Sequence, residues 1–343
     1  MHRPNASNAA KTVTLSIDTS NYTTSVAAVD ASGNIVADER QLLKVEEGER
    51  GLRQSQALFQ HIVALPDLIK KVTDYIHAEG YKICTVAASD KPRPVDGSYM
   101  PVFLAGTNTG RAMAAALNVP FYTFSHQEGH IAAVCGIRPD DEEYLSFHLS
   151  GGTGEIISVK GNMPLDIVGG IKDISFGQLL DRTGVALGME FPAGAQLDRI
   201  ALQGKDKINC RRSRTGKFVM DNPMMKPIHI DDCFANLSGI ETQAQKLAAD
   251  SETDVESFVA ELFCRVSEAL AELTVNTCKS TGIRKIVFAG GVSASSFLRT
   301  VLPQRLFGSG IDISFGSARL SSDNACGTGR LGMDMFLKEK GQV

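Results

Sequence analysis

Two histidines, His126 and His130, stand four positions apart in the segment His-Gln-Glu-Gly-His. If this segment is helical, the spacing places both imidazoles on one face, with Cβ atoms about 5–6 Å apart. Two neutral imidazoles so placed can share one divalent ion and leave positions for a carboxylate and a substrate. Glu128 projects from another face and is expected to orient a ligand without touching the ion. The alternative is two unrelated histidines near a helix start, because this spacing alone is a weak motif.

The elements around the pair are those that could present ligands at the edge of a sheet. Residues 117–124 are predicted to form a short strand that leads directly into the histidine segment. Near the other end of the chain, Asp323 precedes a glycine-rich helical segment. Two interpretations stay open for Asp323: it is the N-cap of that helix, or it is a carboxylate ligand to the metal.

Three polar or glycine-rich turns follow predicted strands and could hold an anion. The tip 18–24 closes a hairpin between strands within residues 12–30, and the tip 151–154 closes a second hairpin between strands 144–150 and 155–160. Amides and hydroxyls at such tips can hold a phosphate, although an ordinary polar turn is the alternative. Gly290 and Gly291 follow a buried strand and precede a helix, where a backbone without Cβ can approach a nucleotide.

The length of the chain and the order of its predicted strands and helices predict two α/β halves. The 343 residues suggest two domains or one duplicated fold. We predict a disordered tail over 1–11, an N-terminal half over 12–142 and a C-terminal half over 143–343, in which the second hairpin echoes the first. Further strands are predicted over 35–39, 83–88, 286–289 and 311–315, and helices over 55–79, 102–117, 177–187, 196–203 and 254–281. Residues 46–53 and 90–98 are predicted to be loops.

Composition limits the classes of partner. The net charge of −4 argues against binding of nucleic acid by the whole surface. The basic stretch 205–217 has two interpretations. The general one is a solvated loop, and the more specific one is a segment that contacts RNA phosphates. No segment approaches about 18 uninterrupted apolar residues, so no membrane span is predicted. The seven cysteines are scattered, odd in number and never spaced Cys-x-x-Cys, which is typical of reduced thiols in a cytoplasmic protein.

Six short motifs, taken in order, resemble one known family. They are Ile17-Asp18-Thr19-Ser20, His126-x-Glu128-Gly129-His130, Ser150-Gly151-Gly152, Asp173-x-x-x-Gly177 through Asp181, Ala289-Gly290-Gly291-Val292-Ser293 and Ser322-Asp323-Asn324. Over nearly its whole length the chain resembles the TsaD/Gcp family, the transferase subunit that makes N6-threonylcarbamoyladenosine in tRNA and was once called a glycoprotease.

The resemblance implies a fold, a cofactor and a reaction. The fold is the duplicated actin-like/Hsp70-like ATPase (ASKHA) fold, with two α/β halves and a central nucleotide cleft. His126, His130 and Asp323 match the family's ligands for one divalent metal, iron or zinc. Residues implied to contact an adenylate-type nucleotide or substrate are Asp18, Ser20, Leu149, Ser150, Gly151, Gly152, Thr153, Asp181, Gly194, Gly290, Gly291 and Ser295. A partner enzyme makes threonylcarbamoyl-AMP from threonine, bicarbonate and ATP, and this subunit transfers the threonylcarbamoyl group to N6 of adenosine 37 in tRNA.

The chain departs from the family pattern around the nucleotide. The family's Ser-Gly-Gly-His-Thr is Ser150-Gly151-Gly152-Thr153-Gly154 here, and Ser295 replaces an asparagine. These changes are typical of a divergent paralogue. Two further functions therefore stay open: a carbamoyl-type transferase with another acceptor, and a non-catalytic nucleotide-binding scaffold that pairs with a related ASKHA subunit. A zinc peptidase is disfavoured because Gln127, and not glutamate, follows the first histidine. A sugar kinase would rest on the fold alone.

Overall fold

The computed structural model describes residues 11–20, 22–45, 52–149, 151–208, 210–212 and 218–341, without the side chains of 210–212, 218, 219 and 318. It divides into two compact units: unit 1 comprises Met1–Asp140, Gly161–Pro164 and Asp323–Val343, and unit 2 comprises Asp141–Lys160 and Leu165–Ser322. The sequence-based division placed all of 143–343 in one half, whereas here the last helix belongs to unit 1. Except for Lys11, the predicted tail lies outside the described residues, as do residues 46–51 of the predicted loop.

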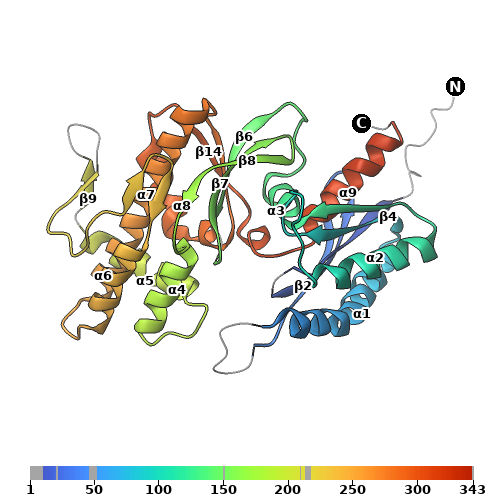
Figure 1. Cartoon of the computed structure of the whole chain (residues 1–343), viewed down its shortest axis with the longest axis horizontal. Coiled ribbons are helices and arrows are strands. Elements are labelled where there is room, and N and C mark those ends of the chain that lie inside the picture. Colours follow the sequence, from blue (N-terminus) through green and yellow to red (C-terminus); the bar gives the residue numbers. More distant parts are fainter. Residues whose placement is uncertain are drawn as a thin grey trace. The chain divides into compact units, whose positions relative to one another are not determined.

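Unit 1 is built on a five-stranded sheet in the order β3-β2-β1-β4-β5 (Figure 1). Its strands are β1 (Thr12–Asp18), β2 (Thr23–Asp30), β3 (Ile35–Leu42), β4 (Lys82–Lys91) and β5 (Phe121–Ser125). The first three strands are antiparallel, and β4 and β5 continue the sheet in parallel with β1. The predicted opening hairpin and third strand are present. The predicted strand over 117–124 starts later, because the preceding helix ends at Leu117 and Asn118 adopts a left-handed conformation.

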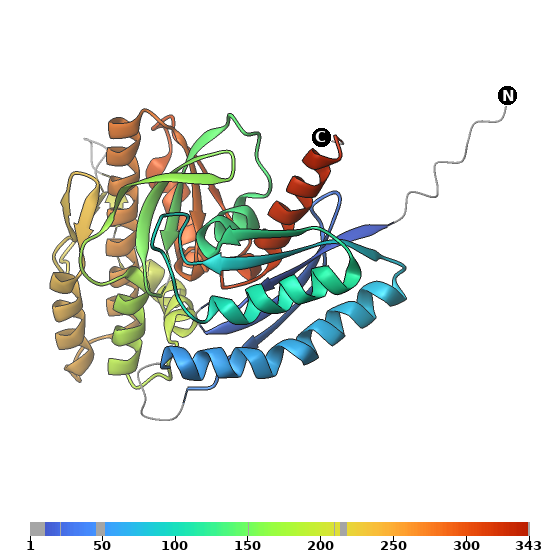
Figure 2. The same ribbon diagram turned by 45° about the vertical axis from the view of Figure 1, so that its right-hand side comes forward.

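The alternation of side chains along β1 decides which helix covers which face of this sheet. Val13, Leu15 and Ile17 belong to the core that they share with α1 (Gln54–Ala78) and α2 (Phe103–Leu117). Figure 2 shows these two helices running side by side. The contacts between the helices and between each helix and the strands bury the apolar face of the sheet, which is the main source of stability for such a layer.

The opposite face of β1 carries small polar side chains and is covered by α9 (Cys326–Glu339). A Cβ at Gly329 would lie 2.7 Å from Oγ of Ser16, and one at Gly332 would lie 2.7 Å from Cβ of Ala87. Glycine on this side of α9 therefore lets the helix lie directly on the strands. Asp18 follows the same alternation as Ser16, so the carboxylate at the end of β1 is on the face that α9 covers.

Unit 2 repeats the strand order of unit 1. Its seven-stranded sheet runs β11-β12-β8-β7-β6-β13-β14. These strands are β6 (Glu143–Leu149), β7 (Gly154–Lys160), β8 (Met163–Ile171), β11 (His229–Asp231), β12 (Phe234–Asn236), β13 (Lys285–Ala289) and β14 (Asp312–Phe315). The β6–β7 pair is antiparallel, and β13 and β14 extend the sheet in parallel with β6, as β4 and β5 do with β1. The similarity between the two predicted hairpins in the sequence corresponds to this repeated topology.

The helices of unit 2 form a core around α7 (Val255–Thr281). The other helices are α4 (Phe176–Ala186), α5 (Gly194–Gly204), α6 (Ser238–Ala249) and α8 (Ser296–Leu306), and a separate two-stranded sheet joins β9 (Cys210–Arg212) to β10 (Phe218–Met220). The ends of α7 follow from its sequence: the Asp254 carboxylate accepts a hydrogen bond from the amide of Glu256, and Gly282 adopts the left-handed conformation at the C-cap. All of the helices predicted from the pattern of apolar residues are present, with ends shifted by at most two residues.

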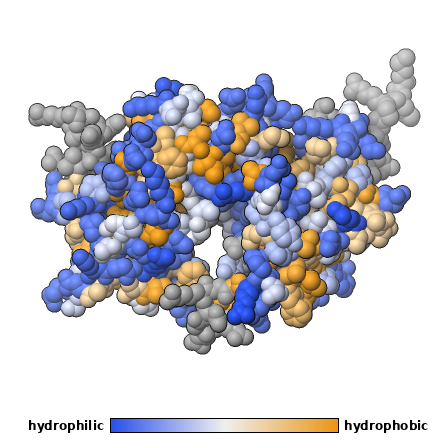
Figure 3. Space-filling view, in the orientation of Figure 1, coloured by the Kyte–Doolittle hydropathy of each residue, from blue (hydrophilic) through white to orange (hydrophobic). Residues whose placement is uncertain are grey.

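Two surface properties bear on partners. Phe59, Ile62 and Val63 of α1 are largely exposed, and hydrophobic residues gather over this helix at the lower right of Figure 3. Among the described residues, none of the helices has both the length and the apolar character that a membrane crossing requires.

The described cysteines form no disulfide.

Candidate metal centre and nucleotide-contacting residues

The two histidines begin α3 (His126–Cys135), which starts where β5 ends. Ser125 is the N-cap: its hydroxyl accepts from the amide of Glu128, and the Glu128 carboxylate accepts from the amide of Ser125 at 2.7 Å. This reciprocal pair is a capping box. The predicted role for Glu128 is therefore corrected, because its carboxylate closes the helix start through Ser125. The local sequence thus fixes the first turn, and with it the two imidazoles on one face.

Asp323 meets both histidines from the segment before α9. Its Oδ1 lies 3.2 Å from Nε2 of His130 and 3.6 Å from Nε2 of His126, and the two imidazole centroids are 4.3 Å apart. One ligand atom from each of the three residues falls within 4.8 Å of the others. The N-cap interpretation of Asp323 is wrong, because α9 begins at Cys326 and the Asn324 side chain accepts from the amide of Cys326.

The charges of His126 and Asp323 stabilise each other. Burial lowers the pKa of His126, but the carboxylates of Asp18 and Asp323 outweigh that effect and raise it to about 10. Burial raises the pKa of Asp323, but hydrogen bonds and charge from His126 and His130 hold it well below its usual range. The cluster therefore balances anionic oxygens with positive charge, which is also what a bound divalent cation would supply.

The donor set suits a divalent metal. Two imidazole nitrogens and one carboxylate oxygen are a ligand combination that both zinc and iron accept. The side chains of His126 and Asp323 remain 19% and 22% exposed, so the cluster is open to solvent on one side. Three protein ligands with an accessible side are typical of catalytic metal sites, in which the remaining position takes water or substrate.

Asp18 and Ser20, two of the predicted nucleotide contacts, lie at the end of β1 and just after it in unit 1. Both are almost completely buried, and Asp18 contacts Ser20, Ser89 and His126. Their predicted role as nucleotide contacts stays a prediction, and the hydrogen bonds of their side chains join Ser20 to Asp18 and Asp18 to Ser89 and His126. Sequence reasoning missed Ser89, which comes at the end of a buried strand. The small polar residue directly after the apolar residues 86–88 was the available signal.

The remaining predicted nucleotide contacts all lie in unit 2, and several meet at the carboxyl ends of β6 and β13. Leu149 ends β6, and Gly151 and Gly152 are exposed at the hairpin tip, where an added Cβ would meet no atom within 4 Å. The carbonyl of Gly151 accepts a hydrogen bond from the Ser175 hydroxyl at the start of α4. Gly290 follows β13 and packs on the backbone of Leu149. In open α/β sheets, this end of parallel strands is where ligands bind.

The other predicted contacts are already engaged within unit 2. Asp181 Oδ1 accepts from the amides of Ala193 and Gly194 at 2.9 and 3.3 Å, and burial raises the pKa of this carboxyl. The Ser295 hydroxyl donates to Asp198 and caps α8. Thr153 is half-buried beside the hairpin tip, and Ser150 lies outside the described residues. A nucleotide role for these residues stays a prediction.

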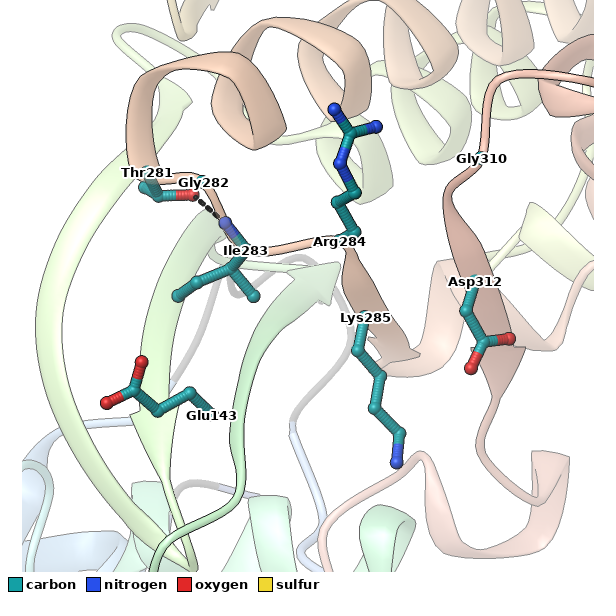
Figure 4. Close-up of a pocket in the computed structure, with 8 residues that line it drawn as sticks. All are labelled: Glu143, Thr281, Gly282, Ile283, Arg284, Lys285, Gly310 and Asp312. Carbon is teal, nitrogen blue, oxygen red and sulfur yellow. Dashed lines mark hydrogen bonds between the residues drawn. The ribbon is translucent and has the colours of Figure 1, made fainter.

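The hollow drawn in Figure 4 lies at the opposite ends of β6 and β13, where these strands begin. It is lined by Glu143, Thr281, Gly282, Ile283, Arg284, Lys285, Gly310 and Asp312. Glu143 and Lys285 begin β6 and β13, whereas Leu149 and Gly290 come at or just after the ends of these strands. This hollow therefore contains none of the predicted nucleotide contacts.

The basic stretch 205–217 is only partly described. Lys207 forms ion pairs with Asp254 and Glu256 at 3.1 and 2.8 Å. Residues 213–217 and the side chains of 210–212 lie outside what the structure describes. The expected contact of this stretch with RNA phosphates stays a prediction.

Gly290 and Gly291 allow a matched test of the nucleotide prediction. Gly290 has φ +88° and its Cβ would lie 2.3 Å from the Leu149 carbonyl oxygen, so we expect Gly290→Val to destabilise unit 2 by itself. Gly291 has no atom within 4 Å of an added Cβ, so Gly291→Val should fold normally and weaken adenine-nucleotide binding by crowding the ligand. Calorimetry with AMP measures this effect.

Gly239→Val is the control for the Gly291 variant, because Gly239 is in α6 and also has open space around an added Cβ. It should keep the wild-type affinity for AMP. Equal affinities for Gly291→Val and the wild type would contradict the placement of the nucleotide beside this turn.

Comparison with known proteins identifies relatives along most of the chain. The family model for tRNA N6-adenosine threonylcarbamoyltransferase matches residues 36–329. A curated protein of that name from Syntrophotalea carbinolica is 33% identical over 239 residues, covering 68% of this chain and 66% of the relative. Another of the same name, from Staphylococcus saprophyticus, is 26% identical and covers 95% of this chain and 92% of the relative.

Solved structures establish the fold class. HypF from T. kodakarensis superposes with a TM-score of 0.59 at 12% identity, over 97% of this chain and 49% of that one. Component A of the Acidaminococcus fermentans (R)-2-hydroxyglutaryl-CoA dehydratase gives a TM-score of 0.50 at 14% identity, over 94% and 98% of the two chains. At these identities the likeness concerns the fold alone. It confirms the predicted duplicated α/β fold of the actin-like/Hsp70-like (ASKHA) class.

Proposed function

Because this chain belongs to the family of tRNA N6-adenosine threonylcarbamoyltransferases, we propose that it transfers a threonylcarbamoyl group from threonylcarbamoyl-AMP to N6 of adenosine 37 in tRNA. The observation that carries the proposal is the convergence of His126, His130 and Asp323 on one point. The proposal assigns one divalent ion, iron or zinc, to these three residues of unit 1. It assigns the adenylate to the glycine turns of unit 2.

The chemistry needs positioning more than a protein nucleophile. In the donor, the carbamoyl carbon is already activated as a mixed anhydride with phosphate. The N6 amine attacks this carbon, a C–N bond forms, the C–O bond to phosphate breaks, AMP leaves, and the amine loses a proton. When bound, the ion would supply a Lewis acid for the carbamoyl or phosphoryl oxygen.

This chain's own residues supply binding and orientation. Gly151, Gly152 and Gly291 leave space around their backbone where a phosphate can approach. The Ser175 hydroxyl holds the hairpin tip through the carbonyl of Gly151, so the turn is fixed before the ligand arrives. Holding the carbamoyl carbon close to the amine lowers the entropic part of the barrier.

The predicted partners belong to the same proposal. The acceptor is tRNA, the substrate named for the relatives. A protein partner, either a related ASKHA subunit or the adenylate-forming enzyme, is supported by the exposed apolar side chains of α1. The cytoplasmic location stays a prediction.

The proposal is tested by the nucleosides of cellular tRNA. In a strain lacking this chain, mass spectrometry should show loss of N6-threonylcarbamoyladenosine. The wild-type gene should restore it, and the His126→Ala/His130→Ala variant, expressed at the same level, should not. His229→Ala, an exposed histidine of β11, should restore it fully. An unchanged amount of the nucleoside in the deletion strain would refute the tRNA acceptor and favour a small-molecule acceptor.

A further inference from the structure

We propose that Asp18 is the positioning residue that holds His126 so that Nε2 faces the metal. The inference deepens the proposed function, because it rests on the divalent ion assigned to His126, His130 and Asp323. It gives Asp18 a task in the metal centre, which differs from the nucleotide contact expected from the sequence.

The hydrogen bonds of Asp18 leave its carboxylate a single orientation. Oδ1 accepts from the amide of Ser20 at 2.8 Å and from the hydroxyl of Ser20. Oδ2 accepts from the hydroxyl of Ser89 at 2.6 Å and meets Nδ1 of His126 at 2.9 Å. Asp18 is 1% exposed, so these protein groups replace its hydration. Four donors around two oxygens fix the carboxylate before a metal binds.

This arrangement decides which nitrogen of His126 is presented. Nδ1 donates its hydrogen to the carboxylate, so Nε2 is the atom directed toward Asp323. The imidazole also packs against His130, with the two ring planes at 78°, and against Phe103, with 6.3 Å between ring centroids. A carboxylate behind a metal-binding imidazole fixes the tautomer and makes the ligand nitrogen more basic.

The same carboxylate is connected to the helix that follows Asp323. Ser89 Oγ, which donates to Asp18, lies 3.1 Å from the hydroxyl of Thr328 in α9. Asp18, at the end of β1, therefore contacts β4 through Ser89 and α3 through His126, and Ser89 in turn contacts α9. A residue so placed acts on the metal through His126, since its own oxygens are occupied.

The test is the metal affinity of Asp18→Asn. The amide keeps the size of the side chain but loses its charge, and its NH2 group can face Nδ1 and favour the wrong tautomer. We expect the dissociation constant for Zn²⁺, measured by calorimetry, to rise about 10- to 100-fold. The visible absorption spectrum of the Co²⁺-loaded protein should also change, because the ligand field depends on how the imidazole is held. Asp67→Asn, an exposed aspartate of α1, is the matched control and should bind as the wild type does.

A double-mutant cycle separates positioning from a general structural effect. In the His126→Ala background, Asp18→Asn should cause no further loss of Zn²⁺ affinity, because the imidazole through which it acts is gone. An equal loss in both backgrounds would overturn the inference. If Asp18→Asn does not fold, Ser89→Ala serves instead, and it should weaken Zn²⁺ binding only when His126 is present.

The outcomes distinguish this inference from the proposed function. Wild-type affinity and an unchanged Co²⁺ spectrum in Asp18→Asn, with metal bound by the wild type, would overturn the role of Asp18 alone. Absence of metal binding by the wild-type chain would overturn both the metal centre and the inference.

Discussion

Replacing both His126 and His130 with alanine is expected to leave the purified protein without a bound divalent ion. The wild type should carry one iron or zinc ion per chain. The double variant keeps only Asp323 of the three ligands, and a single carboxylate does not hold such an ion tightly. His126→Ala alone should lower the occupancy strongly. Elemental analysis by mass spectrometry after gel filtration measures the occupancy.

The control for this prediction is His229→Ala, which removes an exposed imidazole from β11 of unit 2 and should leave the metal content unchanged. In the double variant the buried Asp18 carboxylate loses its imidazole partner, which is expected to lower the stability of unit 1. Circular dichroism therefore has to establish that this variant is folded. Full metal content in the folded double variant would end the proposal that these histidines are ligands.

Gly327→Ala is expected to produce the largest loss of stability among single methyl additions to unit 1. Gly327 is near the start of α9, where it faces α3, and an added Cβ would lie 1.8 Å from the carbonyl oxygen of Gly129 and 2.5 Å from the amide of Ala133. Both neighbours are helix backbone, which cannot move aside as a flexible side chain can. The two helices must separate, and overpacking of this kind costs about 1–3 kcal/mol, occasionally more. Urea unfolding measures the change.

The same substitution should weaken metal binding without altering any ligand. Asp323 lies four residues before Gly327, and the histidines are on the helix that the new methyl group would push away. Gly239→Ala is the matched control, because an added Cβ there meets no atom within 4 Å. It should leave both the stability of the fold and the metal affinity close to those of the wild type. Equal stabilities for Gly327→Ala and the wild type would contradict the close packing of α3 on α9.

The sequence by itself determined the features that depend on local spacing. The helical repeat places His126 and His130 on one face, and Ser125 with Glu128 marks the start of that helix. Alternation along the opening hairpin predicted its strands, and six ordered motifs predicted the family and the fold class. Each of these signals is read from a few neighbouring residues or from the order of such short motifs along the chain, so no knowledge of the packing was needed.

Only the tertiary structure decided how residues distant in the chain meet. Asp323 is separated by 193 residues from His130, and Asp18 by 108 residues from His126. Nothing in the spacing shows that Asp18 is directed at Nδ1 of an imidazole, because its alternative as a turn residue has the same local pattern. The same is true of Gly290, whose lack of a side chain is required by the Leu149 backbone. The contacts of Asp18 and Asp323 arise when β1, β4, α3 and α9 of unit 1 pack together, and that of Gly290 arises when β6 and β13 of unit 2 pair. Such packing depends on the whole core of each unit.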